Sequence, residues 1–427
     1  MQFDKISGDV QFEDGILKVP KNAFYGLSKI SFEEMRKFFR EEHLEHWKHI
    51  LNSPESSDSE KEKMQRNLGA AVESAKTGVP YCQDTGTDTV YIFRGDKVVL
   101  DGENSLETEI QNGATFARKN NPYRNSVFVP DKESLEKNSG DNSPAEIHFF
   151  HNENENEIRG VFCNKGGGSG SKLWNFSMPP SLYQSQEKLM SFLLGKIAEL
   201  GHSACPPYQL RIVLGGLSQL HNSELLTRST VDEFSFESDK VIRDTDLEKA
   251  INSRVKNSEM GAQGEGKFFT MPDGIRVFRA SRHAAHFFIG IGVACSAHRV
   301  QSFKINQEGV WLEKLCKCPY KFLEQVQESK SQKVKKLVNL SEEKGAVLGK
   351  LRKIKAGEEF LISGKILGAR DKAHARWIDN FEKEGVIPDY LREILGVFYV
   401  GPSDTPEGEI IGSFGPTTAA RMDEFAE

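Results

Sequence analysis

Three cysteines lie in short motifs marked by glycine or proline, and their residue type points to soft-metal chemistry. Cys82 stands in YCQDTGTDT, Cys205 in ACPPY and Cys295 in GIGVACSAHR. Thiolates favour zinc, copper and iron–sulfur clusters. Three thiolates leave one position of a tetrahedral site or a cluster unfilled, and an unfilled position is where a metal can act on a substrate. Each cysteine, taken alone, also fits a small buried apolar side chain.

The residues beside Cys82 add chemistry to the same segment. Gln83 offers an amide and Asp84 a carboxylate, directly before a Thr-Gly turn. A metal-bound substrate needs a ligand, a hydrogen-bond donor and an acid or base in one place. The same residues also suit an Asx-type turn. Their position next to Cys82 favours the functional interpretation.

Other motifs suit the binding of an anion. The run KGGGSGSK, Lys165 to Lys172, lacks the Gly-Lys-Ser/Thr ending of a nucleotide-binding loop. Its backbone N–H groups could still face an anion or a cluster sulfide, and a close-packed turn is the alternative. The adjacent Arg282 and His283 lie upstream of Cys295 and suit an anionic ligand.

Two polar groups lie near the C-terminus. ARDKAH contains Arg370 and His374, and GPTTAAR contains Thr417, Thr418 and Arg421. Arginine pairs with a carboxylate through two parallel hydrogen bonds. Taken alone, each group fits a helix cap or a surface ion pair equally well.

Composition limits the partners of the chain. It has 427 residues, 37% hydrophobic and 28% charged, which is typical of a globular protein of two or three domains. A net charge of −6 indicates neither a nucleic-acid nor a membrane partner. No apolar stretch approaches the roughly 20 residues that cross a bilayer. An anionic substrate would therefore need a local basic pocket.

The cysteine count predicts a reducing compartment. Six cysteines in a chain of this length are too sparse for a disulfide scaffold, and the polar start of the chain is no targeting signal. We therefore expect a cytoplasmic protein. Cys163, Cys316 and Cys318 are interpreted as incidental thiols, because CKC has one intervening residue where zinc motifs have two.

Several elements must position these motifs. Apolar periodicity predicts helices over residues 30–51, 61–78 and 181–201, and buried strands over 210–216 and within 274–299. Residues 131–157 are expected to form a solvated loop or hairpin. Charged residues 326–345 are expected to link a first domain, 1–325, to a second, 346–427.

The motifs together resemble a known family. YCQDTGT, KGGGSGSK, ACPPY, RHAAH, GVACSAHR, GARDKAH and GSFGPTTAARMD follow the order seen in class I, iron–sulfur-dependent fumarate hydratases and in the related L-tartrate dehydratases. The resemblance runs from about residue 60 to the C-terminus. It implies an α+β fold, with a larger, mainly helical cluster domain and a smaller β-rich swivelling domain, assembled as a homodimer.

The resemblance also implies a site. Cys82, Cys205 and Cys295 would bind a 4Fe-4S cluster whose open iron acts as a Lewis acid on a small dicarboxylate. Asp84 and Thr417 would form the acid–base pair. The other residues expected to line the substrate pocket are Gln83, Arg124, Gly167, His283, Arg370 and Arg421.

The chain departs from the family pattern in places. It stops at Glu427, before a segment that carries an active-site lysine in single-chain members. Three explanations are open: another chain supplies the segment, the protein does without it, or the sequence is a truncated form. His286, Phe287 and Phe288 replace small residues. These differences leave two alternatives: a dehydratase for L-tartrate or a substituted fumarate, and an iron–sulfur or ligand-binding protein without catalysis. A zinc site is a variant of the second.

Overall fold

The computed structural model describes residues 1–427 except 153–154, 232–239, 263, 324–335, 356–357, 359, 406, 416–421, 423–424 and 426–427. The chain forms two compact units. The larger comprises Met1–Leu323 with Ser403–Ser413, and the smaller comprises Glu324–Pro402 with Phe414–Glu427. The expected domain limits and linker stay a prediction. Residues 324–335 lie outside the described residues, and Lys336–Asn339 form strand β17.

The larger unit combines helices with sheets in similar proportion. Its helices are α1 (Asn22–Glu34), α2 (Glu41–Asn52), α3 (Asp58–Thr77), α4 (Leu106–Lys119), α5 (Gly167–Gly170), α6 (Gln186–Leu200), α7 (Gln219–Ser229) and α8 (Thr245–Asn257). Short 3₁₀ turns cover Pro180–Leu182 and Pro319–Phe322. The three-stranded sheet joins β2 (Gln11–Glu13), β3 (Ile16–Pro20) and β5 (Val98–Asp101), and a hairpin pairs β6 (Phe128–Asp131) with β7 (Leu135–Asn138).

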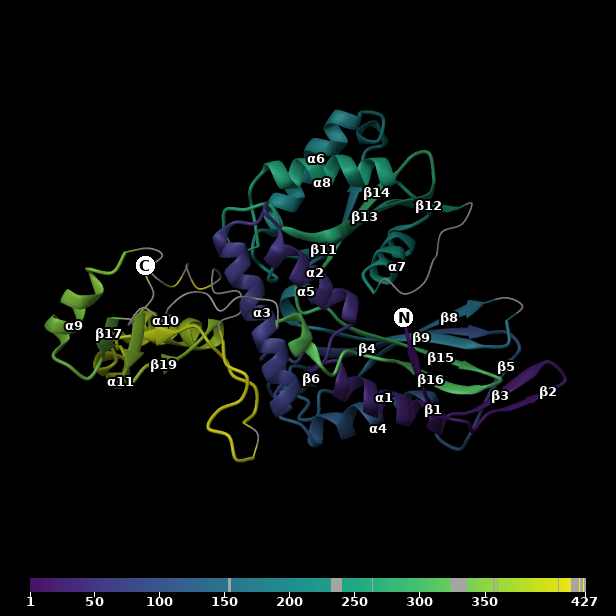
Figure 1. Cartoon of the computed structure of the whole chain (residues 1–427), viewed down its shortest axis with the longest axis horizontal. Coiled ribbons are helices and arrows are strands. Elements are labelled where there is room, and N and C mark those ends of the chain that lie inside the picture. The colour runs from purple at the N-terminus through teal and green to yellow at the C-terminus, as the bar shows by residue number, and fades with distance from the viewer. Residues whose placement is uncertain are drawn as a thin grey trace. The chain divides into compact units, whose positions relative to one another are not determined.

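The larger unit contains a six-stranded sheet built from both ends of its chain segment. Its strands, in order, are β1 (Phe3–Ser7), β16 (Gly309–Glu313), β15 (Arg299–Asn306), β9 (Ile158–Lys165), β4 (Thr87–Gly95) and β8 (Glu146–Asn152). Apolar residues of α1 and α4 pack on one face of this sheet, around Phe162 and Phe303. Figure 1 shows both helices running along that face. The motifs of Asp84 and Lys165 therefore lie at one end of the paired strands β4 and β9.

The larger unit also contains a five-stranded sheet. Its order is β10 (Leu173–Met178), β14 (Phe287–Ala294), β11 (Tyr208–Gly216), β13 (Thr270–Arg282) and β12 (Val241–Arg243). Helices α6 and α8 cover one face through Leu193 and Ile251, and α7 covers the other through Leu226 (Figure 1). Because both faces are covered, β11 is buried along almost its whole length, as its run of apolar residues predicts.

Helix α3 leads the chain into the Cys82 motif. Ser57 and Glu60 form a capping box at its start, and Gly78 ends it with a φ of 76°, a conformation that favours glycine. The next residues are anchored at once, because the backbone N–H of Tyr81 donates to the carbonyl oxygen of Arg36 at 2.9 Å. The Cys82 segment therefore begins from a fixed helix end.

The smaller unit contains two short parallel strand pairs with helices. Strand β17 pairs with β18 (Phe360–Ser363), and β19 (Leu367–Gly368) pairs with β20 (Val397–Phe398). Its helices are α9 (Lys344–Leu351), α10 (Asp371–Glu384) and α11 (Asp389–Glu393). Among the described residues of this unit, α10 is the longest element.

The α+β class is confirmed, with a different balance inside each unit. Two large sheets accompany the helices of the larger unit, and helix outweighs strand in the described part of the smaller one. Residues 61–78 and 181–201 contain α3 and α6 as expected, whereas 30–51 is broken between α1 and α2. Residues 131–157 are not wholly loop or hairpin, since Glu146–Asn152 pair in parallel with β4.

Candidate active site

The loops that carry the three cysteines converge within the larger unit. Cys82 precedes β4, Cys205 precedes β11 and Cys295 follows β14. The backbone N–H of Ser296 donates to the carbonyl oxygen of Cys205 at 3.0 Å, which joins the second and third loops. Burial raises the pKa of the Cys82 thiol to about 12; Arg299 opposes this, and the negative charges of Asp84, Cys205 and Cys295 add to it. The three thiols are therefore electrostatic neighbours.

Cys205 is held in an uncommon backbone conformation. Its φ is 61°, a region that residues other than glycine rarely adopt. The surrounding loop is tied by Tyr208, whose hydroxyl accepts from the backbone N–H of Ala204 and donates to the carbonyl oxygen of Gly201, both at 3.0 Å. These contacts fix the direction in which the Cys205 side chain leaves the loop.

The spacing of the donors bears on the type of metal group. In the part of the chain that the structure describes, no three His, Cys, Asp or Glu side chains are arranged around a single ion. The cysteines of a four-iron cluster bind different irons, so they lie farther apart than the ligands of one ion. The three convergent thiols are the type of donor that an iron–sulfur cluster takes.

Asp84 is the best-positioned acidic group beside these loops. Its carboxylate accepts the backbone N–H of Gly86 at 3.1 Å and that of Gly167 at 2.8 Å. The Nη2 of Arg124 lies 3.9 Å from Asp84 Oδ1. The backbone N–H groups of the glycine run were expected to suit an anion. One of them, the N–H of Gly167, donates to the Asp84 carboxylate.

Close approach explains two of the glycines. A Cβ on Gly166 would lie 3.0 Å from Asp84 Oδ2, and one on Gly86 would lie 2.5 Å from the carbonyl oxygen of Lys165. Gly86 also has a φ of 66°. Gly86 is therefore required for the close approach of the Asp84 turn to the glycine run, and a side chain at position 166 would crowd the Asp84 carboxylate.

A buried ion network lies behind the Cys82–Gly86 segment. Asp88 is fully buried between the guanidinium groups of Arg36 and Arg118. Burial would raise the pKa of Asp88, but Arg36 and Arg118 hold it below its usual value. Two buried arginines share this carboxylate, which leaves an excess of positive charge behind the segment.

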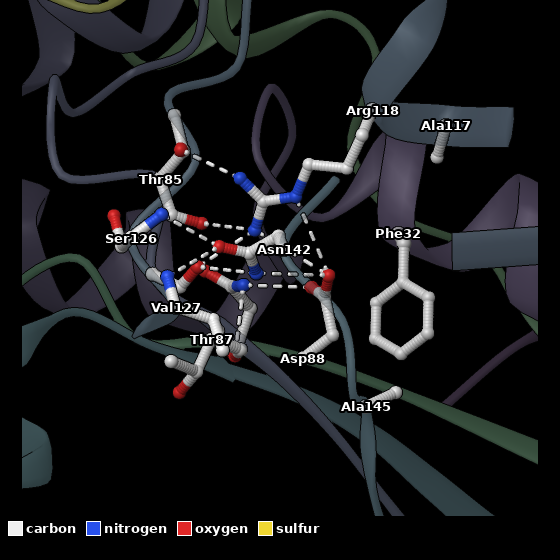
Figure 2. Close-up of polar contacts among 12 residues, drawn as sticks. Phe32, Thr85, Thr87, Asp88, Ala117, Arg118, Ser126, Val127, Asn142 and Ala145 are labelled. Atoms are coloured by element: carbon white, nitrogen blue, oxygen red, sulfur yellow. Dashed lines mark hydrogen bonds and ion pairs between the residues drawn. The ribbon is translucent and has the colours of Figure 1, made fainter. Parts of the chain in front are cut away.

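Arg118 connects the network to the Asp84 turn and to Arg124, and Figure 2 shows it beside Thr85 and Asp88. Its Nη2 donates to the carbonyl oxygen of Gly86 at 2.6 Å, and its Nη1 donates to the carbonyl oxygen of Arg124 at 2.6 Å and to Thr85 Oγ1 at 3.0 Å. The Thr85 hydroxyl also donates to the Arg124 carbonyl oxygen, at 2.8 Å. A single guanidinium therefore sets the Asp84 turn and Arg124 relative to each other.

Two asparagines complete the network. Asn142 donates to the carbonyl oxygen of Gly86 at 3.2 Å and accepts the backbone N–H of Ser126 at 2.7 Å (Figure 2). Asn164 donates to Asp88 Oδ1 and to the carbonyl oxygen of Thr87, both at 3.0 Å. Because buried polar groups are costly unless paired, this web stabilises one conformation of the loop.

Further residues of the site were missed by sequence reasoning. The buried Arg299 donates to the carbonyl oxygen of Asp84 at 2.8 Å. Burial lowers the pKa of Lys63, while the charges of Cys205 and Cys82 raise it, so Lys63 lies near two of the thiols. The hydroxyl of Ser413 donates to the carbonyl oxygen of Pro80, beside the Cys82 motif. Of these, only Arg299 had a signal, its place in GVACSAHR.

Apart from His283, the expected site residues divide into three groups. The larger unit brings together Cys82, Gln83, Asp84, Arg124, Gly167, Cys205 and Cys295. Arg370 caps α10 in the smaller unit, where its carbonyl oxygen accepts the backbone N–H of His374 at 3.1 Å. Thr417, Thr418 and Arg421 lie outside the described residues.

His283 is not brought to the cysteines of its own chain. It lies on an exposed turn before β14, and Cys295 follows the other end of that strand. An eight-residue strand spans roughly 25 Å. Phe287 begins the same strand and packs in the core against Tyr183.

Comparison with known proteins matches nearly the whole chain. The fumarate hydratase family profile matches residues 27–304, and the fumarase C-terminus profile matches residues 309–427. The described residues contain no helix that is long and apolar enough to cross a membrane.

Individual relatives give the same result. The chain is 35% identical to fumarate hydratase 1, mitochondrial, of Leishmania major, over 96% of this chain and 75% of the relative. It is 33% identical to the aerobic class I fumarate hydratase of Escherichia coli K12, with the same coverage. A putative L(+)-tartrate dehydratase subunit alpha of Methanocaldococcus jannaschii is 30% identical over 54% of this chain and 81% of its own length. The chain therefore belongs to the fumarate hydratase family and is a hydro-lyase.

Proposed function

We propose that this enzyme catalyses the reversible hydration of fumarate to L-malate with a 4Fe-4S cluster bound by Cys82, Cys205 and Cys295. The convergence of the three cysteine loops beside Asp84 and Arg124 carries the proposal. When bound, the cluster would supply an open iron that acts as a Lewis acid on the substrate.

Positive charge around the site suits a dicarboxylate. Arg124 lies at the Asp84 carboxylate, Arg299 lies behind it, and Lys63 lies near the thiols. The whole chain carries a net charge of −6, so this is the local basic pocket that an anionic substrate requires. Arg124 would bind one substrate carboxylate and fix its orientation.

Asp84 is the proposed proton-transfer group. The N–H groups of Gly86 and Gly167 hold its two oxygens in place, and the Arg299 bond to its carbonyl fixes the backbone. Hydration adds a proton and a hydroxyl across the double bond, and an oriented carboxylate can transfer a proton in this reaction. Thr417 is the proposed partner in this acid–base pair, and Arg370 and Arg421 are proposed substrate ligands.

The position of His283 supports a homodimer. His283 and Cys295 lie at opposite ends of β14, so His283 cannot reach the thiols of its own chain. We infer that it enters the site of a second copy. Mixing Asp84→Asn chains with His283→Ala chains would then restore one active site per mixed dimer, whereas each variant alone would be weak. Mixed dimers that stay inactive would contradict the inference.

An activity assay tests the function. The chain is reconstituted anaerobically with iron and sulfide and is offered fumarate, L-malate, L-tartrate and methyl-substituted fumarate. We expect fumarate–malate interconversion with the highest kcat/KM. Preference for tartrate or the substituted fumarate would replace the substrate assignment. A cluster-loaded protein inactive on all four would support a binding function.

The reduced thiols that a cluster needs are most readily kept in the cytoplasm, and we propose that compartment for the protein. Cell fractionation followed by immunoblotting tests this proposal.

A further inference from the structure

A cavity of about 340 Å³ lies outside the proposed active site, among α2, β11, β13 and the start of β15. Basic side chains outnumber acidic ones in its wall, which contains four arginines, three histidines and two carboxylates. Those that carry the argument are Arg40, His43, Arg211, Arg276 and His298. A volume of this order is typical of small-molecule sites.

Basic groups converge at His298. Burial and the nearby His43, Arg40, Arg211 and Lys165 hold the pKa of His298 well below its usual value. His298 Nε2 is buried and has no hydrogen-bond partner among the described residues. A buried ring nitrogen without a partner is unfavourable, and it is a donor in the tautomer that carries the proton on Nε2. In that tautomer a bound oxyanion would accept this N–H, and the nearby guanidinium groups of Arg40 and Arg211 would attract the anion.

The arginines around His298 are held in fixed positions. Arg40 makes two hydrogen bonds of 2.8 Å to the carboxylate of Glu313. Arg211 donates to the carbonyl oxygens of Ser229 at 2.9 Å and Gly274 at 2.8 Å. Guanidinium groups that are already oriented lose little entropy when they bind an oxyanion.

The two acidic residues of the wall lie near His46. Glu42 and Asp273 influence His46, whose pKa burial lowers and these carboxylates raise. The charged groups that act most strongly on His298 are all basic. The cavity therefore has a basic region at His298, distinct from the mixed region at His46.

The basic region adjoins the Cys295 loop from the side of α2. His43 Nε2 contacts the carbonyl oxygen of Ser296 at 2.8 Å. Ring contacts link His43 to Phe39 and Trp47, and both of these contact Tyr81, which precedes Cys82. This aromatic layer lies between the cavity and the Cys82 segment.

We propose that the cavity is a second anion site, which binds a small oxyanion with two or more charges through His298 and the surrounding arginines. Phosphate groups and polycarboxylates share this chemistry. Through His43 and Ser296, the occupied site would restrain the loop that carries Cys295. The site is independent of the proposed hydration reaction, because anion binding can be measured without turnover.

The test is isothermal titration calorimetry on the full-length chain freed of metal, so that the probes do not bind iron. Pyrophosphate and citrate serve as probes at matched ionic strength, with chloride as the blank. His298→Leu removes a buried polar atom that lacks a partner, so this variant should fold. Arg276→Gln is the second variant. His49→Leu is the matched control. His49 is exposed on α2, the helix that carries His43, and it does not line the cavity.

We expect saturable binding of at least one probe, weakened tenfold or more in His298→Leu and Arg276→Gln and unchanged in His49→Leu. The tighter probe identifies the phosphate or the carboxylate class. Arg124→Gln should leave binding intact. Loss of binding in Arg124→Gln would assign the anion to the active site, and unchanged binding in both cavity variants, or no saturable binding, would overturn the proposal.

Discussion

The backbone N–H of Ser296 donates to the carbonyl oxygen of Cys205 at 3.0 Å, although the two residues belong to loops at different strands of the five-stranded sheet. This bond joins the loops of two candidate cluster ligands. The third loop is tied to them by Arg299, which follows Cys295 in the chain and donates to the carbonyl oxygen of Asp84. One backbone–backbone bond and one bond from a side chain to a backbone oxygen thus connect the three loops.

Replacement of the three convergent cysteines should remove the cluster. Cys82→Ser, Cys205→Ser and Cys295→Ser are each expected to lose most of the iron bound after anaerobic reconstitution, because serine is a poor ligand for iron–sulfur clusters. Cys318→Ser is the control, since Cys318 is exposed and remote in the sequence from all three motifs. Iron and sulfide analysis checks this prediction. Three variants that keep full iron content would contradict the assignment.

Asp84→Asn should separate catalysis from cluster binding. The amide keeps the size of the carboxylate but cannot act as a base, so we expect kcat to fall by about 10²–10⁴-fold. Iron content should match that of the unchanged chain, because Asp84 is not a proposed ligand. Steady-state kinetics and iron analysis on one sample measure both. A kcat within a few-fold of the original would remove Asp84 from the acid–base role.

Arg118 should act as a positioning residue. Arg118→Lys keeps the charge, but one ammonium cannot span the Gly86 and Arg124 carbonyl oxygens. We expect KM for fumarate to rise and kcat to fall, together by roughly 10–100-fold in kcat/KM. Thr85→Val, which removes one hydroxyl of the same contact, should show a smaller effect in the same direction.

Arg228→Lys is the matched control for Arg118→Lys. Arg228 is a partly buried arginine that stacks on Phe93 and Phe150, away from the Asp84 turn. Its variant should lose some stability and keep KM. If Arg118→Lys changes only the melting temperature, as the control does, Arg118 contributes to stability and not to the geometry of the site.

Asp88 should make stability depend on pH at the acid end. Arg36 and Arg118 depress the pKa of Asp88 in the folded chain, so its stabilising effect is present above the unfolded value, about 3.9, and is lost as pH falls through the folded value. Asp88→Asn leaves two buried cations without their carboxylate and should cost about 3–5 kcal/mol at neutral pH.

Urea unfolding of the metal-free chain at several pH values measures this effect. The difference in unfolding free energy between the unchanged chain and Asp88→Asn should shrink as pH falls below about 4. A difference that stays constant over this range would show that Asp88 contributes by packing and hydrogen bonding, not by its charge.

The sequence predicted individual helices and strands better than it predicted the breaks between helices and the pairing of strands. Gly201 and the preceding apolar period predicted the end of α6 correctly. The break between α1 and α2 was missed because apolar residues continue through it. Within the break, the backbone of Phe39 forms a β-bridge with Cys316. Strand β8 was missed because its polar sequence gains strand structure only from pairing with β4.

The site was predictable where its chemistry lay within one motif. Cys82, Gln83 and Asp84 are neighbours in the chain. Gly167 and Asp84, both among the expected site residues, are in contact through the Gly167 N–H. The pairing of Asp88 with Arg36 and Arg118 was missed, because a single sequence does not show which of many charges meet in the core. His283 was placed beside Cys295 by closeness in sequence, but the strand between them separates the two in space.

The central claim is that Cys82, Cys205 and Cys295 hold a four-iron cluster with one iron open to substrate. The most direct measurement is Mössbauer spectroscopy of the chain reconstituted with ⁵⁷Fe, before and after addition of L-malate. We predict that one iron site of the cluster changes its signal on addition of malate while the other three do not. A chain without cluster iron, or a cluster whose signals are all unaffected by malate, would contradict the account.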